Sequence, residues 1–215
     1  MPAESTPPTS DRARLIAILV RRSLAFGRFT LASGATSAFY VDVRKTSLDA
    51  EGAEILGRLA LDAFADDLAG GRIDAVGGLT LGADPIVIAV LLEARRRGHA
   101  LDGFLVRKAQ KAHGQENLIE GNLSRGARAL VVEDVCTSGE SALQAVRAAR
   151  AAGAEVMGAW CVVDRASGGR EALAAEGIQL TACLDLDMLL AASPEGRAIL
   201  AGRAGSRPAA GRPAG

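Results

Sequence analysis

Short apolar runs alternate along the chain with longer segments in which apolar residues recur every three or four positions. Five runs have the length and composition of buried strands: residues 73–77, 103–106, 129–133, 156–163 and 179–184. Three segments between or after them have helical spacing: residues 84–97, 141–152 and 171–176. Apolar strands that alternate with helices predict an α/β domain with a mostly parallel central sheet flanked by helices.

The first seventy residues depart from this alternation. Residues 11–25 and 51–68 have the apolar spacing of helices, and we expect one unbroken helix in each. Between them, apolar residues at 29–31 and 39–43 flank a Ser33-Gly34 turn, which predicts a hairpin. Further on, Asp84-Pro85 has the residue types of an N-cap followed by proline at the first helical position.

The two ends of the chain differ in composition from the part between them. Residues 1–9 are rich in Pro, Ser and Thr, and residues 203–215 consist mostly of Ala, Gly, Arg and Pro. Neither end has enough apolar surface to offset the entropy of ordering, so both are predicted to be disordered tails. Residues 10–202 contain no linker or repeat and are predicted to form a single domain.

Composition narrows the class of function. The chain has 25 basic and 25 acidic side chains among 215 residues, so no overall field favours nucleic acid or an anionic membrane. Three widely spaced cysteines (Cys136, Cys161 and Cys183) form no CxxC pair, which is typical of a reducing cytosol. No apolar stretch approaches the ~20 residues of a membrane helix. We therefore expect a soluble cytoplasmic protein with local charge at its site.

The richest candidate site follows the apolar run at 129–132. Two acids, Glu133 and Asp134, come where the strand ends, and a turn containing Thr137, Ser138 and Gly139 leads into a helix. Ligands of parallel sheets bind at the carboxyl ends of strands, and backbone amides at a helix start can hold a phosphate. The acids suit ribose hydroxyls or a nearby Mg²⁺. The alternative is a helix N-cap beside two solvated acids.

A basic segment follows the strand at 103–106. Arg107, Lys108, Lys111 and His113 fall within seven residues. As a loop, this segment could close over a strongly negative group, and His113 could donate to a phosphate oxygen or become charged as that group leaves. The alternative is a solvated basic turn, which is the usual fate of such a run.

Both segments resemble known motifs. The strand, acid pair and hydroxyl-rich turn resemble the phosphoribosyl pyrophosphate motif of the type I phosphoribosyltransferases. The spacing Arg-Lys-x-x-Lys-x-His-Gly resembles the catalytic loop of the orotate phosphoribosyltransferase family, which is a more specific match. The resemblance covers roughly residues 10–190. It implies a type I phosphoribosyltransferase-like α/β fold with a small hood built from the N-terminal segment.

The resemblance also implies roles for particular residues. Arg107, Lys108, Lys111 and His113 would be the catalytic, pyrophosphate-binding residues, in a loop that reaches the neighbouring subunit's site in a homodimer. The residues implied to bind phosphoribosyl pyrophosphate are Glu133, Asp134, Val135, Cys136, Thr137, Ser138, Gly139, Glu140 and Ser141. No covalent nucleophile is needed, so Cys136 is interpreted as a small buried filler.

The base would bind near the N-terminal segment. Phe39, Tyr40 and Thr137 are implied to contact it, and Arg165, at the end of a strand, is implied to bind the orotate carboxylate. A guanidinium can meet a carboxylate in a bidentate fork, although Arg165 could equally be a surface arginine at a strand end.

The chain departs from the family at two places. Ala32 stands where many members have lysine, and the loop at 78–84 has no cation; Arg44 and Lys45 could replace the lost charge.

The implied activity is that of a pentosyltransferase, a glycosyltransferase class. Phosphoribose would pass from phosphoribosyl pyrophosphate to orotate, giving orotidine 5'-monophosphate and pyrophosphate for pyrimidine biosynthesis, with Mg²⁺ as cofactor and no metal ligand set assigned. One alternative is a phosphoribosyltransferase for another base, which a carboxylate-binding Arg165 argues against. The other is a regulator that senses phosphoribosyl pyrophosphate, which the zero net charge argues against.

Overall fold

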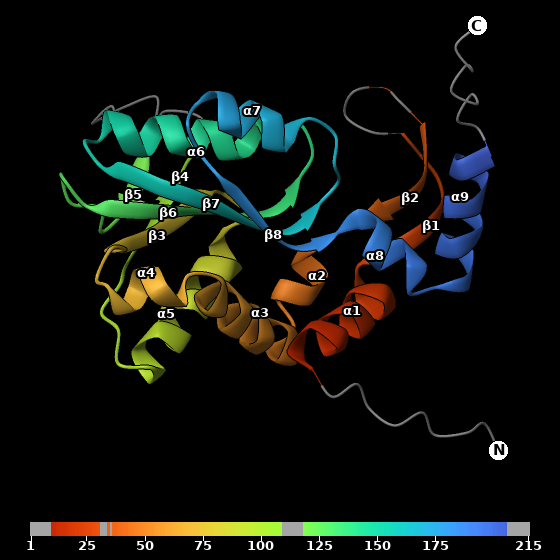
Figure 1. The fold of residues 1–215 in the computed structure, drawn as a ribbon, viewed down its shortest axis with the longest axis horizontal. Helices are drawn as coiled ribbons and strands as arrows, with labels where there is room; N and C mark the ends of the chain where they lie inside the picture. Colours follow the sequence, from red (N-terminus) through yellow and green to blue (C-terminus); the bar gives the residue numbers. More distant parts are fainter. Residues whose placement is uncertain (1–9, 31–33, 35, 109–117, 206–215) are drawn as a thin grey trace, which may run out of the picture.

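A central sheet of six strands organises the molecule (Figure 1). The computed structural model describes residues 10–30, 34, 36–108 and 118–205. The strands are β3 (Ala75–Leu79), β4 (Asp102–Val106), β5 (Ile119–Gly121), β6 (Arg128–Cys136), β7 (Glu155–Asp164) and β8 (Leu180–Asp185). Their order is β5-β4-β3-β6-β7-β8, and every neighbouring pair is parallel except β4 with β5. The predicted α/β class with a mostly parallel sheet is confirmed.

Helices cover both faces of this sheet (Figure 1). On one face lie α6 (Glu140–Ala151) and α7 (Gly169–Ala175), and on the other lie α3 (Ala50–Ala63), α4 (Ala65–Ala69) and α5 (Asp84–Arg96). The alternation of side chains along β6 divides the core accordingly. Leu130 and Val132 belong to the cluster of α3 and α5, whereas Ala129 and Val131 belong to the cluster of α6. This is why the strand is apolar at successive positions.

The N-terminal segment forms a hood at one end of the sheet (Figure 1). After α1 (Asp11–Arg22), strands β1 (Leu24–Thr30) and β2 (Thr36–Val41) pair antiparallel, so the predicted hairpin is confirmed with longer strands. The predicted helix over 11–25 was wrong at its end. Ser23 is buried and its hydroxyl bonds to that of Thr46 at 2.7 Å, while its carbonyl accepts from the N–H of Asp42. These contacts turn the chain into β1.

Two further expectations about helices were wrong. The segment 51–68 is not one helix, because Phe64 leaves helical geometry (φ −126°, ψ 26°) and separates α3 from α4. Asp84 is not an N-cap. Ala83 occupies that position, and the Asp84 carboxylate instead accepts a hydrogen bond of 2.8 Å from the Thr80 hydroxyl.

Several short elements gave no clear periodic signal. These are α2 (Arg44–Ser47), β5, α8 (Leu186–Ala191) and α9 (Pro194–Gly205). Helix α9 packs on α8 and stands beside the hood (Figure 1). It continues to Gly205, so the tail boundary expected at residue 203 falls inside a helix. Among the described helices, none has the length and apolar character needed to cross a membrane.

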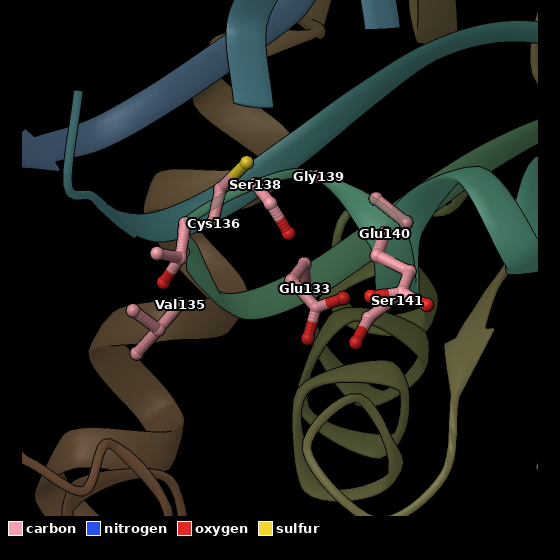
Figure 2. A pocket seen from close by; sticks show the side chains of 9 residues that line it. Glu133, Val135, Cys136, Ser138, Gly139, Glu140 and Ser141 are labelled. Carbon is pink, nitrogen blue, oxygen red and sulfur yellow. The ribbon is translucent and has the colours of Figure 1, made fainter. Parts of the chain in front are cut away.

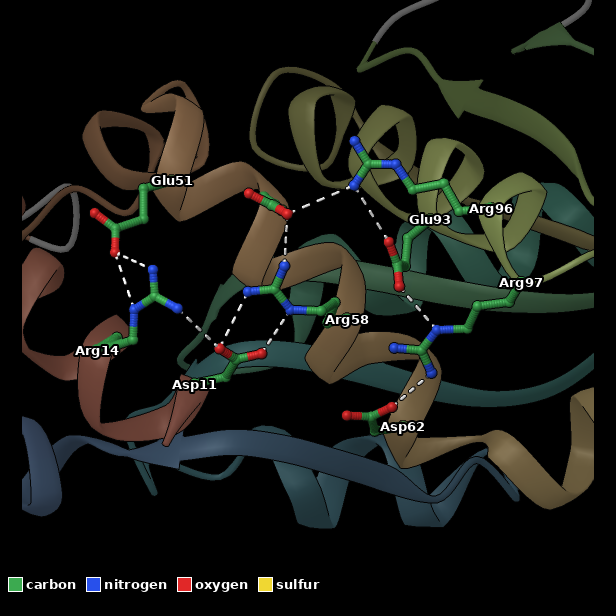
Figure 3. A network of polar contacts seen from close by, with 9 residues as sticks. Asp11, Arg14, Glu51, Arg58, Asp62, Glu93, Arg96 and Arg97 are labelled. Carbon is green, nitrogen blue, oxygen red and sulfur yellow. Dashed lines mark hydrogen bonds and ion pairs between the residues drawn. The ribbon is translucent and has the colours of Figure 1, made fainter. Parts of the chain in front are cut away.

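Ion pairs join α1, α3 and α5 on the outer surface (Figure 3). Arg58 donates two hydrogen bonds to Asp11, at 2.6 and 3.1 Å, and Arg14 donates to Glu51 at 2.7 Å. Partly exposed pairs of this kind each contribute only about 0–1 kcal/mol. We interpret the network mainly as a geometric constraint that fixes the direction of α1, and thereby the point where the chain enters the hood.

Candidate active site

The loops that follow β3, β6 and β7 meet at the carboxyl edge of the sheet. They enclose a cavity of about 310 Å³ together with the end of β2 and the start of the basic segment. The residues that line it are Tyr40, Val41, Asp42, Arg44, Leu79, Thr80, Leu81, Gly82, Lys108, Glu133, Asp134, Val135, Thr137, Ser141 and Arg165. Residues from the acid pair, the basic segment and the expected base site therefore line one cavity.

A second cavity, of about 140 Å³, adjoins it at the start of α6 (Figure 2). It is lined by Glu133, Val135, Cys136, Thr137, Ser138, Gly139, Glu140, Ser141 and Ala142. Gly139 is the N-cap of α6 with φ +79°, and no side chain caps the helix. The first N–H groups of a helix lack intrahelical acceptors and lie at its positive end. This arrangement can bind a phosphate dianion.

The turn before α6 is packed tightly against the start of α7. A Cβ atom added to Gly139 would lie 2.9 Å from the carbonyl oxygen of Gly169. A Cβ atom on Gly169 would overlap the Cys136 sulfur and lie 2.8 Å from the Thr137 carbonyl oxygen. Cys136 is buried, as expected of a filler, and burial raises the pKa of its thiol to about 11. Gly169 was not predicted as a site residue.

Glu133, the first residue of the acid pair, is buried and has a carboxyl oxygen without a hydrogen-bond partner among the described residues. The residue is only 6% exposed, and the unpaired oxygen is Oε2. Burial, together with the adjacent carboxyl of Asp134, raises the pKa of Glu133 to about 9. Asp134 accepts a hydrogen bond of 2.8 Å from the N–H of Val135. With a pKa of about 9, the Glu133 carboxyl holds a proton at neutral pH, and its unpaired oxygen can accept from a hydroxyl donor; a bound cation would lower the pKa and favour the carboxylate.

The loop after β3 approaches the same acids through a glycine. A Cβ atom at Gly82 would lie 2.7 Å from the Asp134 carboxyl group, which leaves room only for hydrogen. The sequence shows that this loop has no cation, but it did not predict that Gly82 and Thr80 line the cavity.

Arg44, proposed as a replacement cation, does line the larger cavity, where it donates to Asp42 at 2.8 Å. Lys45 lines a neighbouring cavity, and Ala32 lies outside the described residues.

Only the base of the basic segment is described. Lys108 lines the larger cavity, and its carbonyl accepts from the Gln144 amide at 3.3 Å. Arg107 does not line this cavity; its guanidinium pairs with Glu120 at 3.5 Å. Lys111 and His113 lie outside the described residues. Of the two predicted catalytic cations that the structure describes, Lys108 lines the cavity of the acid pair and Arg107 does not.

The residues expected at the base are brought together, with one exception. Tyr40, Thr137 and Arg165 line the larger cavity, whereas Phe39 is 2% exposed and lies behind it. The Arg165 guanidinium lies 5.7 Å from the Phe39 ring centroid. Its Nε is buried and has no hydrogen-bond partner among the described residues, and burial lowers the pKa of Arg165. A buried, unpaired guanidinium nitrogen favours an anionic ligand.

The site also bears on whether Mg²⁺ could bind. No cluster of three or more His, Cys, Asp or Glu side chains suited to a metal occurs in the described part of the chain. Mg²⁺ commonly takes only one or two carboxylates and completes its shell with water and substrate oxygens. The unpaired Glu133 oxygen beside Asp134 fits that pattern, with a substrate supplying the remaining oxygens.

Comparison with known proteins identifies the family. The model of the phosphoribosyl transferase domain matches residues 46–178. Orotate phosphoribosyltransferase of Streptomyces avermitilis is 45% identical over 179 residues, which cover 83% of this chain and 96% of the relative. The chain belongs to the orotate phosphoribosyltransferase family. The family and fold inferred from sequence motifs are therefore confirmed.

Solved structures of the family have the same fold. The Mycobacterium tuberculosis orotate phosphoribosyltransferase in complex with Fe(III) dicitrate superposes with a TM-score of 0.74 at 44% identity, covering 84% of this chain and 99% of that one. The same enzyme in complex with 5-phospho-α-D-ribosyl 1-diphosphate gives a TM-score of 0.70 at 42% identity, with the same coverage.

Proposed function

We propose that this chain transfers phosphoribose from phosphoribosyl pyrophosphate to orotate, giving orotidine 5'-monophosphate and pyrophosphate in de novo pyrimidine biosynthesis. The observation that carries the proposal is a pair of adjoining cavities. Together they contain an acid pair, a helix start without a side-chain cap and an arginine whose Nε has no partner among the described residues. These three groups match a sugar, its phosphate and a carboxylated base.

Each part of the site has a role in this reaction. The N–H groups at the start of α6 bind the 5-phosphate, and Glu133 and Asp134 accept hydrogen bonds from the ribose hydroxyls. Arg165 holds the orotate carboxylate, with Tyr40 and Thr137 beside the base. As the bond to pyrophosphate breaks, positive charge develops on the ribose, and fixed acceptors in a buried site stabilise such charge most effectively.

Cations stabilise the leaving pyrophosphate in this proposal. Lys108 lies in the cavity, and Arg107, Lys111 and His113 complete the basic set. Closure of the basic segment would exclude water, which otherwise hydrolyses the activated sugar. When bound at the acid pair and pyrophosphate, Mg²⁺ would supply further neutralisation of the leaving charge.

A direct assay tests the reaction. The purified chain is mixed with Mg²⁺, phosphoribosyl pyrophosphate and orotate, and the loss of orotate absorbance is followed. We expect turnover with orotate and none with uracil or adenine. Turnover with uracil or adenine alone would instead support a phosphoribosyltransferase for another base. Binding of phosphoribosyl pyrophosphate without turnover of any base would support the regulator.

We further propose that the enzyme is a homodimer with active sites shared across the interface. An apolar stripe, defined here as Leu48, Leu81, Pro85, Ile88 and Leu92, supports this proposal. Four of its side chains are highly exposed, from 57% for Ile88 to 76% for Leu48. Such a patch is typical of an interaction surface. Because Leu81 also lines the active cavity, a partner seated on the stripe would adjoin the site.

Ile88→Glu is expected to convert the dimer to a monomer, because a buried carboxylate at the interface costs several kcal/mol. Sedimentation velocity would measure the change. The matched control is Met157→Glu, at an exposed hydrophobic residue on β7 outside the stripe, which should leave the dimer intact. A dimer that persists in Ile88→Glu would remove the stripe from the interface.

Mixing two inactive variants tests the shared site. Lys111→Ala and Asp134→Ala should each lower the rate about 100-fold or more. If the basic segment acts in the partner's site, a mixed dimer has one site with both residues intact. Randomly reassorted dimers should then recover roughly a quarter of the wild-type rate. No recovery after verified subunit exchange would show that each site uses its own segment.

The proposed compartment is the cytoplasm. All three cysteines of the chain are free and buried, which suits a reducing environment. The balanced charge of the chain also supports small-molecule substrates, with no nucleic acid or membrane partner.

A further inference from the structure

Helix α9 brings a second arginine to the base site. The Arg203 guanidinium lies 5.4 Å from the centroid of the Phe39 ring, the same ring that Arg165 approaches at 5.7 Å. Phe39 is 2% exposed, so its ring is enclosed by these neighbours and the core. A guanidinium within about 6 Å of an aromatic face is attracted to it. The ring of Phe39, in the hood, is therefore approached both by Arg165, the residue expected to bind the carboxylate, and by Arg203 on α9.

The position of Arg203 is fixed by the packing of α9 on α8. The N–H of Gly196 donates to the Ser193 hydroxyl at 3.1 Å, and Arg197 donates to the Ala191 carbonyl at 2.9 Å. A Cβ atom at Gly196 would overlap the Leu190 carbonyl, so the two helices approach closely. Arg203 therefore extends from a docked helix.

The two guanidinium groups approach the same ring, and their like charges repel each other unless an anion is bound nearby. The charge of Arg203 adds to burial in lowering the pKa of Arg165. The acid that pairs with Arg203, Asp187, is 3.6 Å away and largely exposed, so its compensation is weak. The Nε of Arg165 has no hydrogen-bond partner in the described part of the chain. An anionic group bound at Arg165 would relieve the repulsion and fill the vacant donor.

We propose that Arg203 is a positioning residue that favours a carboxylated base. It holds the Phe39 ring, against which Arg165 lies, and adds positive potential where the carboxylate binds. Discrimination between orotate and uracil then depends partly on α9, which lies outside the nucleotide-binding loops. This inference rests on the proposed function, since it assumes that the base binds at Arg165.

Two substitutions separate charge from packing. Arg203→Met keeps an unbranched chain against Phe39 and removes the charge, whereas Arg203→Lys keeps the charge. We expect Arg203→Met to raise the KM for orotate about three- to tenfold, with the KM for phosphoribosyl pyrophosphate and kcat nearly unchanged. Arg203→Lys should restore most of the loss. Arg147→Met, at an exposed arginine of α6 that pairs with Glu176 and takes no part in docking α9, is the matched control.

A binding measurement isolates the carboxylate. Orotidine 5'-monophosphate and uridine 5'-monophosphate differ only in that group, and calorimetry gives the ratio of their affinities. Arg203→Met should reduce the preference for orotidine 5'-monophosphate about three- to tenfold, which is the factor by which it should raise the KM for orotate. An unchanged ratio and KM would overturn the role of Arg203 while leaving the proposed function intact. A wild-type chain that does not use orotate would instead overturn the proposed function.

Discussion

Arg165→Ala is expected to lower kcat/KM for orotate about 100-fold, which is the largest effect that we predict at the base site. A hydrogen-bonded charge contributes about 1.5–3 kcal/mol, and each 1.4 kcal/mol corresponds to a factor of ten. The side chain is partly buried with an unpaired Nε, so little of this interaction is lost to solvent screening. Initial rates at varied orotate would measure it.

Two controls distinguish loss of the ligand from loss of the fold. The KM for phosphoribosyl pyrophosphate should change little in Arg165→Ala, because the phosphate cradle is formed by other residues. Arg147→Ala removes an exposed arginine of α6 that pairs with Glu176, and it should leave orotate kinetics unaltered. An Arg165→Ala enzyme with near wild-type kcat/KM for orotate would show that the carboxylate binds elsewhere.

Gly169→Ala is expected to weaken binding of phosphoribosyl pyrophosphate about 100-fold or more. Its Cβ would overlap the Cys136 sulfur and lie 2.8 Å from the Thr137 carbonyl oxygen and 3.0 Å from the Gly139 nitrogen. Two of these atoms belong to backbone, so the turn that we propose to hold the phosphate must shift. A misplacement of about 1 Å can cost 100-fold in rate. Calorimetric titration with phosphoribosyl pyrophosphate would measure the loss.

Gly158→Ala is the matched control for this prediction. A Cβ atom there would meet the Gln179 carbonyl oxygen at 3.5 Å, an ordinary contact, in a strand of the same sheet. It should bind phosphoribosyl pyrophosphate normally. Thermal unfolding of both variants would show whether Gly169→Ala still folds. If folded Gly169→Ala binds as the wild type does, the contact between α7 and the turn does not set the geometry of the cradle.

The sheet, and the segment at the end of β3's neighbour β6 that lines the two cavities, could be predicted because their signals are local. Burial on both faces makes residues 129–132 of β6 continuously apolar, and the acid pair later in the same strand and the turn after it come next in sequence. Arg165 could be placed for a similar reason, since it directly follows a strand whose carboxyl end faces the site. In each case one short segment contains both the structural signal and the chemistry.

The features that were missed depend on contacts between distant segments. Gly169 matters because its backbone lies against the turn at Gly139, and the sequence around residue 169 contains no pattern that predicts this contact. The end of α1 depends on the bond between Ser23 and Thr46, so helical periodicity alone ran past it. Arg203 lies in a segment of low complexity, and its position is set by the packing of α9 on α8.

The antiparallel pairing of β4 and β5 has a consequence for how this enzyme could evolve. Val106 pairs with Ile119, and the N–H of Arg107 donates to the Leu118 carbonyl at 2.9 Å, so the two ends of the basic segment are tethered side by side at the sheet edge. Insertions or deletions between these two ends would alter the length of the segment without changing any strand pairing in the sheet. Its length can therefore diverge among descendants while the scaffold stays constant.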